Sequence, residues 1–228
     1  MLTTILALIL AFLISITYYY SNKHSIKYSK KRNKIISFSA GVSITYVLLE
    51  LFPTFTELAS SVHKLLFLSI LFGFIIHHVI EKEIHQHISK THLKRVLGQE
   101  ENVFSFVYHI IIGIVLVKFI KQDLIQSLLF FVPLASYTFL NTLPTKPHSS
   151  KGKSFFLAGA TILGVIIGLF TQNYITIGLE AALIGLITGV LLFAVIRHHL
   201  PFGKEGEPKY FMVGFLIYSI LIIVSWYI

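Results

Sequence analysis

Eight long apolar runs constrain what this chain can fold into. They cover residues 2–20, 35–52, 63–80, 103–120, 124–142, 154–172, 174–196 and 209–228. Each is close to the approximately 20 residues that a helix needs to cross a hydrocarbon layer about 30 Å thick, and they lack the alternation of a barrel strand. Because 55% of the 228 residues are hydrophobic and 13% are charged, the chain is predicted to be an all-α integral membrane protein with eight transmembrane helices. Residues 1–228 would form a single polytopic domain.

The basic residues are distributed unevenly between the two sides of these runs. All but Lys64, Lys118 and Lys121 fall in or beside the loops that follow the first, third, fifth and seventh runs. Because cytoplasmic loops are enriched in Lys and Arg, this asymmetry predicts that both termini are extracytoplasmic. The net charge of +9 then indicates anionic lipid headgroups as a partner rather than nucleic acid. The compact length and the absence of targeting signals suggest the cell (plasma) membrane.

Two absences narrow the possible chemistry. There is no cysteine, so a metal would have to be held by histidine, carboxylate, amide or hydroxyl groups. The sequence also lacks the HExxH, GxSxG and Walker-type motifs that would indicate an embedded protease, a hydrolase or a nucleotide-binding enzyme. The chain is therefore not expected to be an enzyme, and no resident cofactor is predicted.

An internal repeat relates the second run to the seventh and the third run to the eighth. GVSITYVLLELFP begins at Gly41 and GVLLFAVIRHHLP at Gly189, whereas GFIIHHVI begins at Gly73 and GFLIYSIL at Gly214. Since the second run passes outward and the seventh inward, the two halves would be inverted repeats, an arrangement typical of secondary transporters. Chance similarity between apolar helices rich in glycine is the alternative explanation.

These segments resemble the ZIP (Zrt/Irt-like) family of divalent-metal transporters over nearly the whole chain. FSAGVSITYVLLELFP is similar to the second span of that family, LITGVLLFAVIRHHLP to its seventh and VGFLIYSILIIV to its eighth. The resemblance implies inverted three-helix repeats around a central helix pair. It also implies a cytoplasmic, histidine-containing loop after the third span, here residues 81–102.

In that family the fourth and fifth spans carry motifs such as HNFPDG and HEIPEG, which build a two-metal site. Here the corresponding segments read YHIIIG, from Tyr108, and YTFLNT, from Tyr137. Neither retains a carboxylate. The resemblance thus places a degenerate metal site on five residues with neutral donors: Tyr108, His109, Tyr137, Thr138 and Asn141.

The loss of every carboxylate leaves two functional hypotheses open. A dication in a low-dielectric site needs anionic ligands to offset its desolvation. The chain could transport a divalent metal of the zinc, iron or manganese class, with zinc favoured, at low affinity. Alternatively, it could be a transport-inactive ZIP-fold membrane protein with an interaction or regulatory role. In the first case His109 lines a path, and in the second it belongs to a buried hydrogen-bonded cluster with Tyr137, Thr138 and Asn141.

Further metal candidates lie near the two membrane surfaces. On the cytoplasmic side they are His77, His78, Glu81, His85, His198 and His199. A solvated amphipathic extension with charge pairs four residues apart is the favoured alternative explanation. On the outer side the candidates are Glu50, Glu57 and Glu180, for which a snorkelling or exposed position near a span end is the alternative. The oligomeric state is left open between a monomer and a homodimer.

Overall fold

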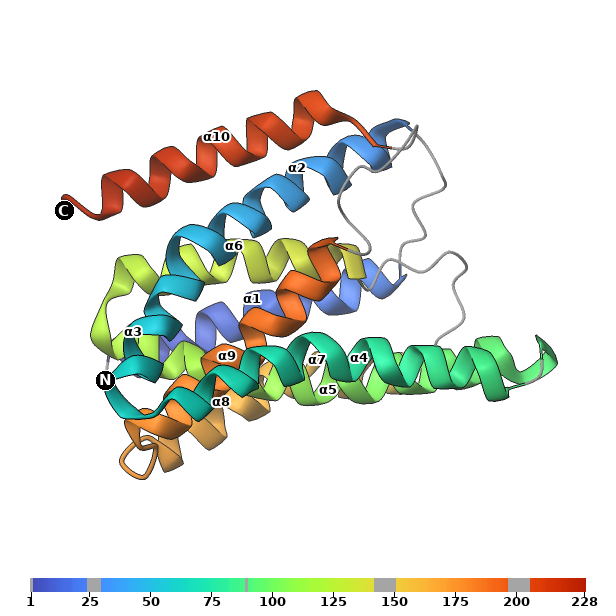
Figure 1. The fold of residues 1–228 in the computed structure, drawn as a ribbon, viewed down its shortest axis with the longest axis horizontal. Helices are drawn as coiled ribbons and strands as arrows, with labels where there is room; N and C mark the ends of the chain where they lie inside the picture. The colour runs from blue at the N-terminus through green and yellow to red at the C-terminus, as the bar shows by residue number, and fades with distance from the viewer. Residues whose placement is uncertain (1, 24–29, 89, 142–150, 197–205) are drawn as a thin grey trace.

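The computed structural model describes residues 2–23, 30–88, 90–141, 151–196 and 206–228, which fold into helices joined by short connections (Figure 1). The elements, in chain order, are α1 (Leu2–Lys23), α2 (Lys30–Tyr46), η1 (Val47–Leu51), α3 (Phe52–Val62), η2 (Lys64–Phe67), α4 (Leu68–His87), α5 (Lys90–Gln122), α6 (Leu124–Asn141), α7 (Lys151–Ala158), α8 (Ala160–Thr171), α9 (Ile177–Ala194) and α10 (Pro208–Ser225).

Six of these helical stretches are long and apolar enough to cross a membrane. They are Leu2–Ser21, Arg32–Val62, Lys64–His87, Asn102–Gln122, Ile177–Ala194 and Pro208–Ser225. Two shorter apolar helices, Leu124–Phe139 and Phe155–Thr171, fall on the fifth and sixth predicted runs. The chain is therefore an all-helical integral membrane protein over the residues described, and its two ends lie at the same end of the bundle (Figure 1).

The second stretch is longer than the predicted run 35–52. It continues through a π-helical turn, in which the Phe52 N–H donates to the Val47 carbonyl, into α3, which ends at Val62. The turn ends at Leu51, two residues before Pro53. Proline has no N–H, and in a regular α-helix its ring would collide with the carbonyl group four residues earlier. Widening the helix by one residue accommodates the proline without ending the helix.

Residues 81–102, predicted to be a loop, are almost entirely helical. α4 ends at His87 with an extended Ile88, and α5 begins at Lys90 and runs for 33 residues. The exposed side chains of Lys82, Glu83 and His85 agree with the alternative of a solvated helical extension. The two helices form a hairpin that extends beyond the rest of the bundle (Figure 1).

Three pairs of helices approach so closely that glycine is required at each crossing. They are α2 with α10, α4 with α9, and α5 with α8. A Cβ atom on Gly41 would overlap the backbone of Phe211 and Phe215, and one on Gly189 would overlap the backbone of Ile70 and Phe74. Backbone-to-backbone packing of this kind brings membrane helices together without a hydrophobic driving force.

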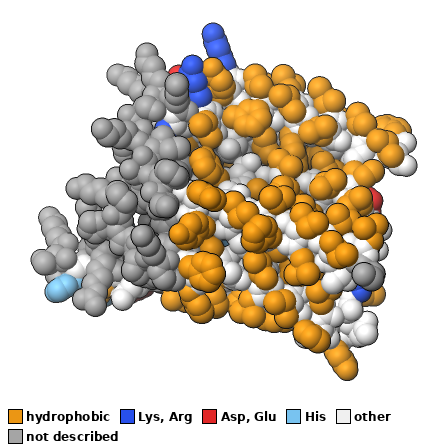
Figure 2. Space-filling model, turned by 180° about the vertical axis from the view of Figure 1, so that it is seen from behind, with side chains coloured by type: hydrophobic (Ala, Val, Ile, Leu, Met, Phe, Trp, Pro, Cys, Tyr) orange, Lys and Arg blue, Asp and Glu red, His pale blue; other side chains and the backbone are white. Residues whose placement is uncertain are grey.

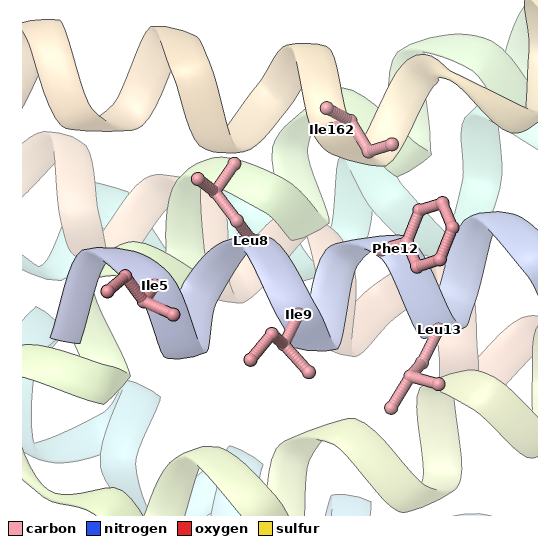
Figure 3. Close-up of a pocket in the computed structure, with 6 residues that line it drawn as sticks. All are labelled: Ile5, Leu8, Ile9, Phe12, Leu13 and Ile162. Carbon is pink, nitrogen blue, oxygen red and sulfur yellow. The ribbon is translucent and has the colours of Figure 1, made fainter. Parts of the chain in front are cut away.

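Apolar side chains cover the flank of the bundle between its two ends (Figure 2). One shallow groove on this flank is formed by the exposed side of α1 with one side chain of α8 (Figure 3). Aliphatic and aromatic carbon lines it throughout: Ile5, Leu8, Ile9, Phe12, Leu13 and Ile162. The groove has the composition of a surface that contacts lipid chains and is separate from the polar residues inside the bundle.

Candidate functional site

The polar cluster inside the bundle is centred on His109, in the middle of α5. Its side chain is only 3% exposed, and Thr138 of α6 is fully buried. Tyr108 and Tyr137, the neighbours of these two residues in the sequence, are also buried. The structure thus brings four of the five central candidates together. The fifth, Asn141, is the last residue of α6, and its side chain lies outside the described part of the structure.

Hydrogen bonds engage both ring nitrogens of His109. Nδ1 lies 2.7 Å from the carbonyl oxygen of Ser105 and 3.3 Å from its hydroxyl. Because a carbonyl can only accept, Nδ1 carries the proton, and in the neutral ring Nε2 is the acceptor. Nε2 lies 3.1 Å from the Thr138 hydroxyl, which donates to it. This pair of bonds fixes the ring and links α5 to α6.

Aromatic rings surround the imidazole. Tyr18 of α1 packs edge-on against it, with ring centroids 5.4 Å apart. Tyr108 and Tyr137 make a similar edge-to-face contact across the α5–α6 interface at 5.6 Å. Edge-to-face packing favours a defined ring geometry, so three helices hold the cluster in place.

The described side chains of the cluster are uncharged: Tyr108 and Tyr137 are phenols, Thr138 is an alcohol, and His109 is a neutral imidazole in the bonded state described above. Ile112, which the resemblance aligns with the acid of the ZIP motif, is completely buried in the apolar core together with Leu116. The cluster can therefore donate and accept hydrogen bonds, but it offers no anionic ligand.

Ser105 and Tyr18 were missed by the sequence reasoning. Ser105 lies one helical turn before His109, so the spacing of four residues could have indicated it. The contact of Tyr18 depends on how α1 packs against α5, for which the sequence offers no local signal.

Two of the three carboxylates predicted for the outer side are buried, and both have partners. Glu180, at the first turn of α9, lies 3.2 Å from the Lys118 ammonium and accepts a hydrogen bond of 3.1 Å from the Gln122 amide. Glu50, in the π-helical turn, accepts a hydrogen bond from the Trp226 indole at 3.3 Å. The alternative of an exposed or snorkelling position therefore fits Glu57, which is exposed, and does not fit the buried Glu50 and Glu180.

The cytoplasmic candidates do not form a defined site in the described residues. His78 and His85 are exposed on α4. The side chains of His77 and Glu81, and the whole of His198 and His199, lie outside the part of the chain that the structure describes. Across the described ranges, no three histidine or acidic side chains are grouped so that they could hold a metal ion.

Comparison with models of protein families finds no match to this chain, and comparison with curated proteins finds no matching sequence either.

Proposed function

We propose that the chain is a transport-inactive, ZIP-like membrane protein that acts through contacts with other membrane components, in an interaction or regulatory role. The observation that carries this proposal is the closed, neutral state of the central cluster. Both nitrogens of His109 are already bonded inside the protein, one to Ser105 and one to Thr138. A metal ion passing through this point would have to displace the Thr138 hydroxyl and would gain no carboxylate in return.

The electrostatic argument concerns the cost of desolvating a dication. Moving one charge from water to a low-dielectric interior has an idealised cost of about 20 kcal/mol, and that cost is offset only by well-placed opposite charge. A zinc site usually provides three or four histidine, thiolate or carboxylate ligands. Here the buried carboxylates of Glu50 and Glu180 are already engaged by Trp226 and Lys118, respectively.

The ZIP-like arrangement is supported by the pairing of the glycine crossings. The internal repeat equates Gly41 with Gly189 and Gly73 with Gly214. The α2–α10 crossing places Gly41 and Gly214 against the opposite backbones, and the α4–α9 crossing does the same for Gly189 and Gly73. Exchanging the two halves converts one crossing into the other, as inverted repeats require. With the basic residues on the cytoplasmic side, both termini would then face outward, across the plasma membrane.

Low-affinity transport of a divalent metal, with zinc favoured, is the second candidate, and one feature of His109 favours it. The Nδ1–H donates to a backbone carbonyl, which is how histidines that bind metals through Nε2 are commonly oriented. The Nε2 lone pair points toward α6, where a transported ion would pass. On this hypothesis Thr138 would exchange with the metal during transport.

Measuring the uptake of zinc, iron and manganese into vesicles containing the purified chain distinguishes the two functional hypotheses. Our proposal predicts uptake no faster than into empty vesicles. Uptake above that background would overturn the proposal of a transport-inactive protein if it is lost in His109→Ala and retained in His92→Ala. The second variant is the control, because it removes an exposed histidine at the start of α5. Far-UV circular dichroism before and after reconstitution would establish that both variants are folded.

A further inference from the structure

We propose that the surface where α2 and α10 begin binds the phosphate headgroup of an anionic phospholipid through Lys34 and Lys209. The two helices start side by side. The Lys34 ammonium lies 4.9 Å from the centre of the Tyr210 ring, and the Glu207 N–H donates to the Ser37 hydroxyl at 2.9 Å. These contacts hold the first turn of α10 against α2 and place Lys34 beside the residue that directly follows Lys209.

The length of α10 places this surface at the level of the lipid headgroups. The helix has 18 residues, so it is about 27 Å long, close to the thickness of about 30 Å of the hydrocarbon layer. Its first turn therefore lies at one boundary of that layer, and its C-cap, Trp226, lies near the other. Tyr210 and Trp226 are both exposed, as expected for aromatic side chains at the two boundaries. Another membrane-crossing stretch begins at Arg32, so Lys34 lies at the same level as Tyr210.

Lys209 continues the lipid-facing stripe of α10. Val213, Leu216 and Ile220 follow it at intervals that place all four residues on one face of the helix. Lys209 is exposed, and the three apolar side chains are 45%, 51% and 60% exposed. Figure 2 shows basic side chains at the edge of the apolar flank. A lipid whose phosphate contacts Lys209 therefore meets a continuous apolar stripe for its acyl chain.

Charge decides which headgroup this surface favours. Among the described residues, Glu207 is the carboxylate whose charge acts on Lys34, and it offsets only one of the two lysines. The first five residues of α2 are KKRNK, which adds further basic residues at the same end. A zwitterionic headgroup has no net charge to pair with this excess, whereas an anionic one does. Free phosphate shares the charge but has no acyl chain to follow the stripe. This inference does not depend on whether the protein transports metal.

Native mass spectrometry of the full chain in detergent tests the proposal. The chain is titrated with phosphatidylglycerol and with phosphatidylcholine of identical acyl chains, and we expect the first to bind more tightly. Lys34→Gln with Lys209→Gln should remove this preference, with a loss of about fivefold for each lysine. Lys34→Arg with Lys209→Arg should retain it, because both charges are kept. Lys121→Gln is the matched control, since it removes an exposed lysine at the opposite end of the bundle (Figure 1).

The outcomes separate a lipid site from general attraction between charges. Equal affinity for the two lipids, or a preference that survives Lys34→Gln with Lys209→Gln, would overturn the proposal. An equal loss of preference in Lys121→Gln would also overturn it, because the effect would then belong to the net charge. Excess inorganic phosphate should leave the phosphatidylglycerol complex intact, and displacement would assign the surface to the free ion instead. Far-UV circular dichroism of each variant would establish that it is folded.

Discussion

Replacing Gly113 by alanine tests the close packing of α5 against α8. A Cβ atom at this position would lie 2.6 Å from the Val165 nitrogen and 2.7 Å from the Gly164 carbonyl carbon, and closer still to the Thr161 oxygen. These are backbone atoms and cannot rotate away, so the helices must separate until each contact exceeds 3.0 Å. A gap of even 0.5–1 Å forfeits about a quarter to a half of the dispersion attraction across the interface.

The expected magnitude combines two opposing effects. Overpacking costs about 1–3 kcal/mol and occasionally more, whereas the better helix propensity of alanine returns at most about 1 kcal/mol. We expect a net loss of about 2 kcal/mol in the free energy of unfolding. Titration with a denaturing detergent, followed by circular dichroism and by the fluorescence of the single tryptophan, Trp226, would measure this loss.

Gly178→Ala is the control for this experiment. A Cβ atom there would meet only Val62 Cγ1 at 3.5 Å, an ordinary contact, so the variant should be neutral or slightly stabilising. The double variant Gly113→Ala with Gly164→Ala should cost less than the sum of the single changes, because one separation relieves both overlaps. Equal stability of Gly113→Ala and Gly178→Ala would refute the packing argument.

Three other predictions concern the polar groups. Glu180→Ala should lower the free energy of unfolding by about 3 kcal/mol, because it leaves the Lys118 ammonium, which is only 20% exposed, without its partner. The double variant Glu180→Leu with Lys118→Leu should recover part of this loss. Equal losses in the single and double variants would contradict the prediction. Thr138→Val should cost about 1–3 kcal/mol by leaving Nε2 of His109 without a donor, and an unchanged detergent titration would show that the bond is not formed. Zinc should leave the unfolding midpoint unchanged, whereas a specific site at 100 times its Kd would add about 2.7 kcal/mol.

The sequence predicts well what depends on local pattern. The apolar runs correspond to the six long and two shorter apolar helices. One of the two hypotheses placed His109 in a buried hydrogen-bonded cluster with Tyr137, Thr138 and Asn141, and His109 and Thr138 are hydrogen-bonded to each other. The helical period of 3.6 residues determines which residues share a face. Polar side chains on such a face inside a membrane form hydrogen bonds with a neighbouring helix.

The sequence did not predict that Glu50 and Glu180 are buried, because their burial depends on partners far away along the chain. Glu50 is paired with Trp226, 176 positions later, and Glu180 with Gln122, 58 positions earlier. Without those partners, a glutamate near the end of a span is expected to be exposed. The π-helical turn before Pro53 is a similar case, because a proline permits either a helix end or a local widening, and packing of the continued α3 against α9 favours the second.

The placement of charge in the structure bears on what can cross the bundle. Glu180 has a basic partner and Glu50 an indole donor, whereas the interactions described for the central cluster involve only neutral groups. A dication reaching His109 would lose its hydration and receive only neutral hydroxyl and imidazole ligands in exchange, without a carboxylate to offset the cost of desolvation. The central cluster is therefore poorly suited to a dication, and a role based on contacts at the membrane-facing surface requires no ion to pass through it.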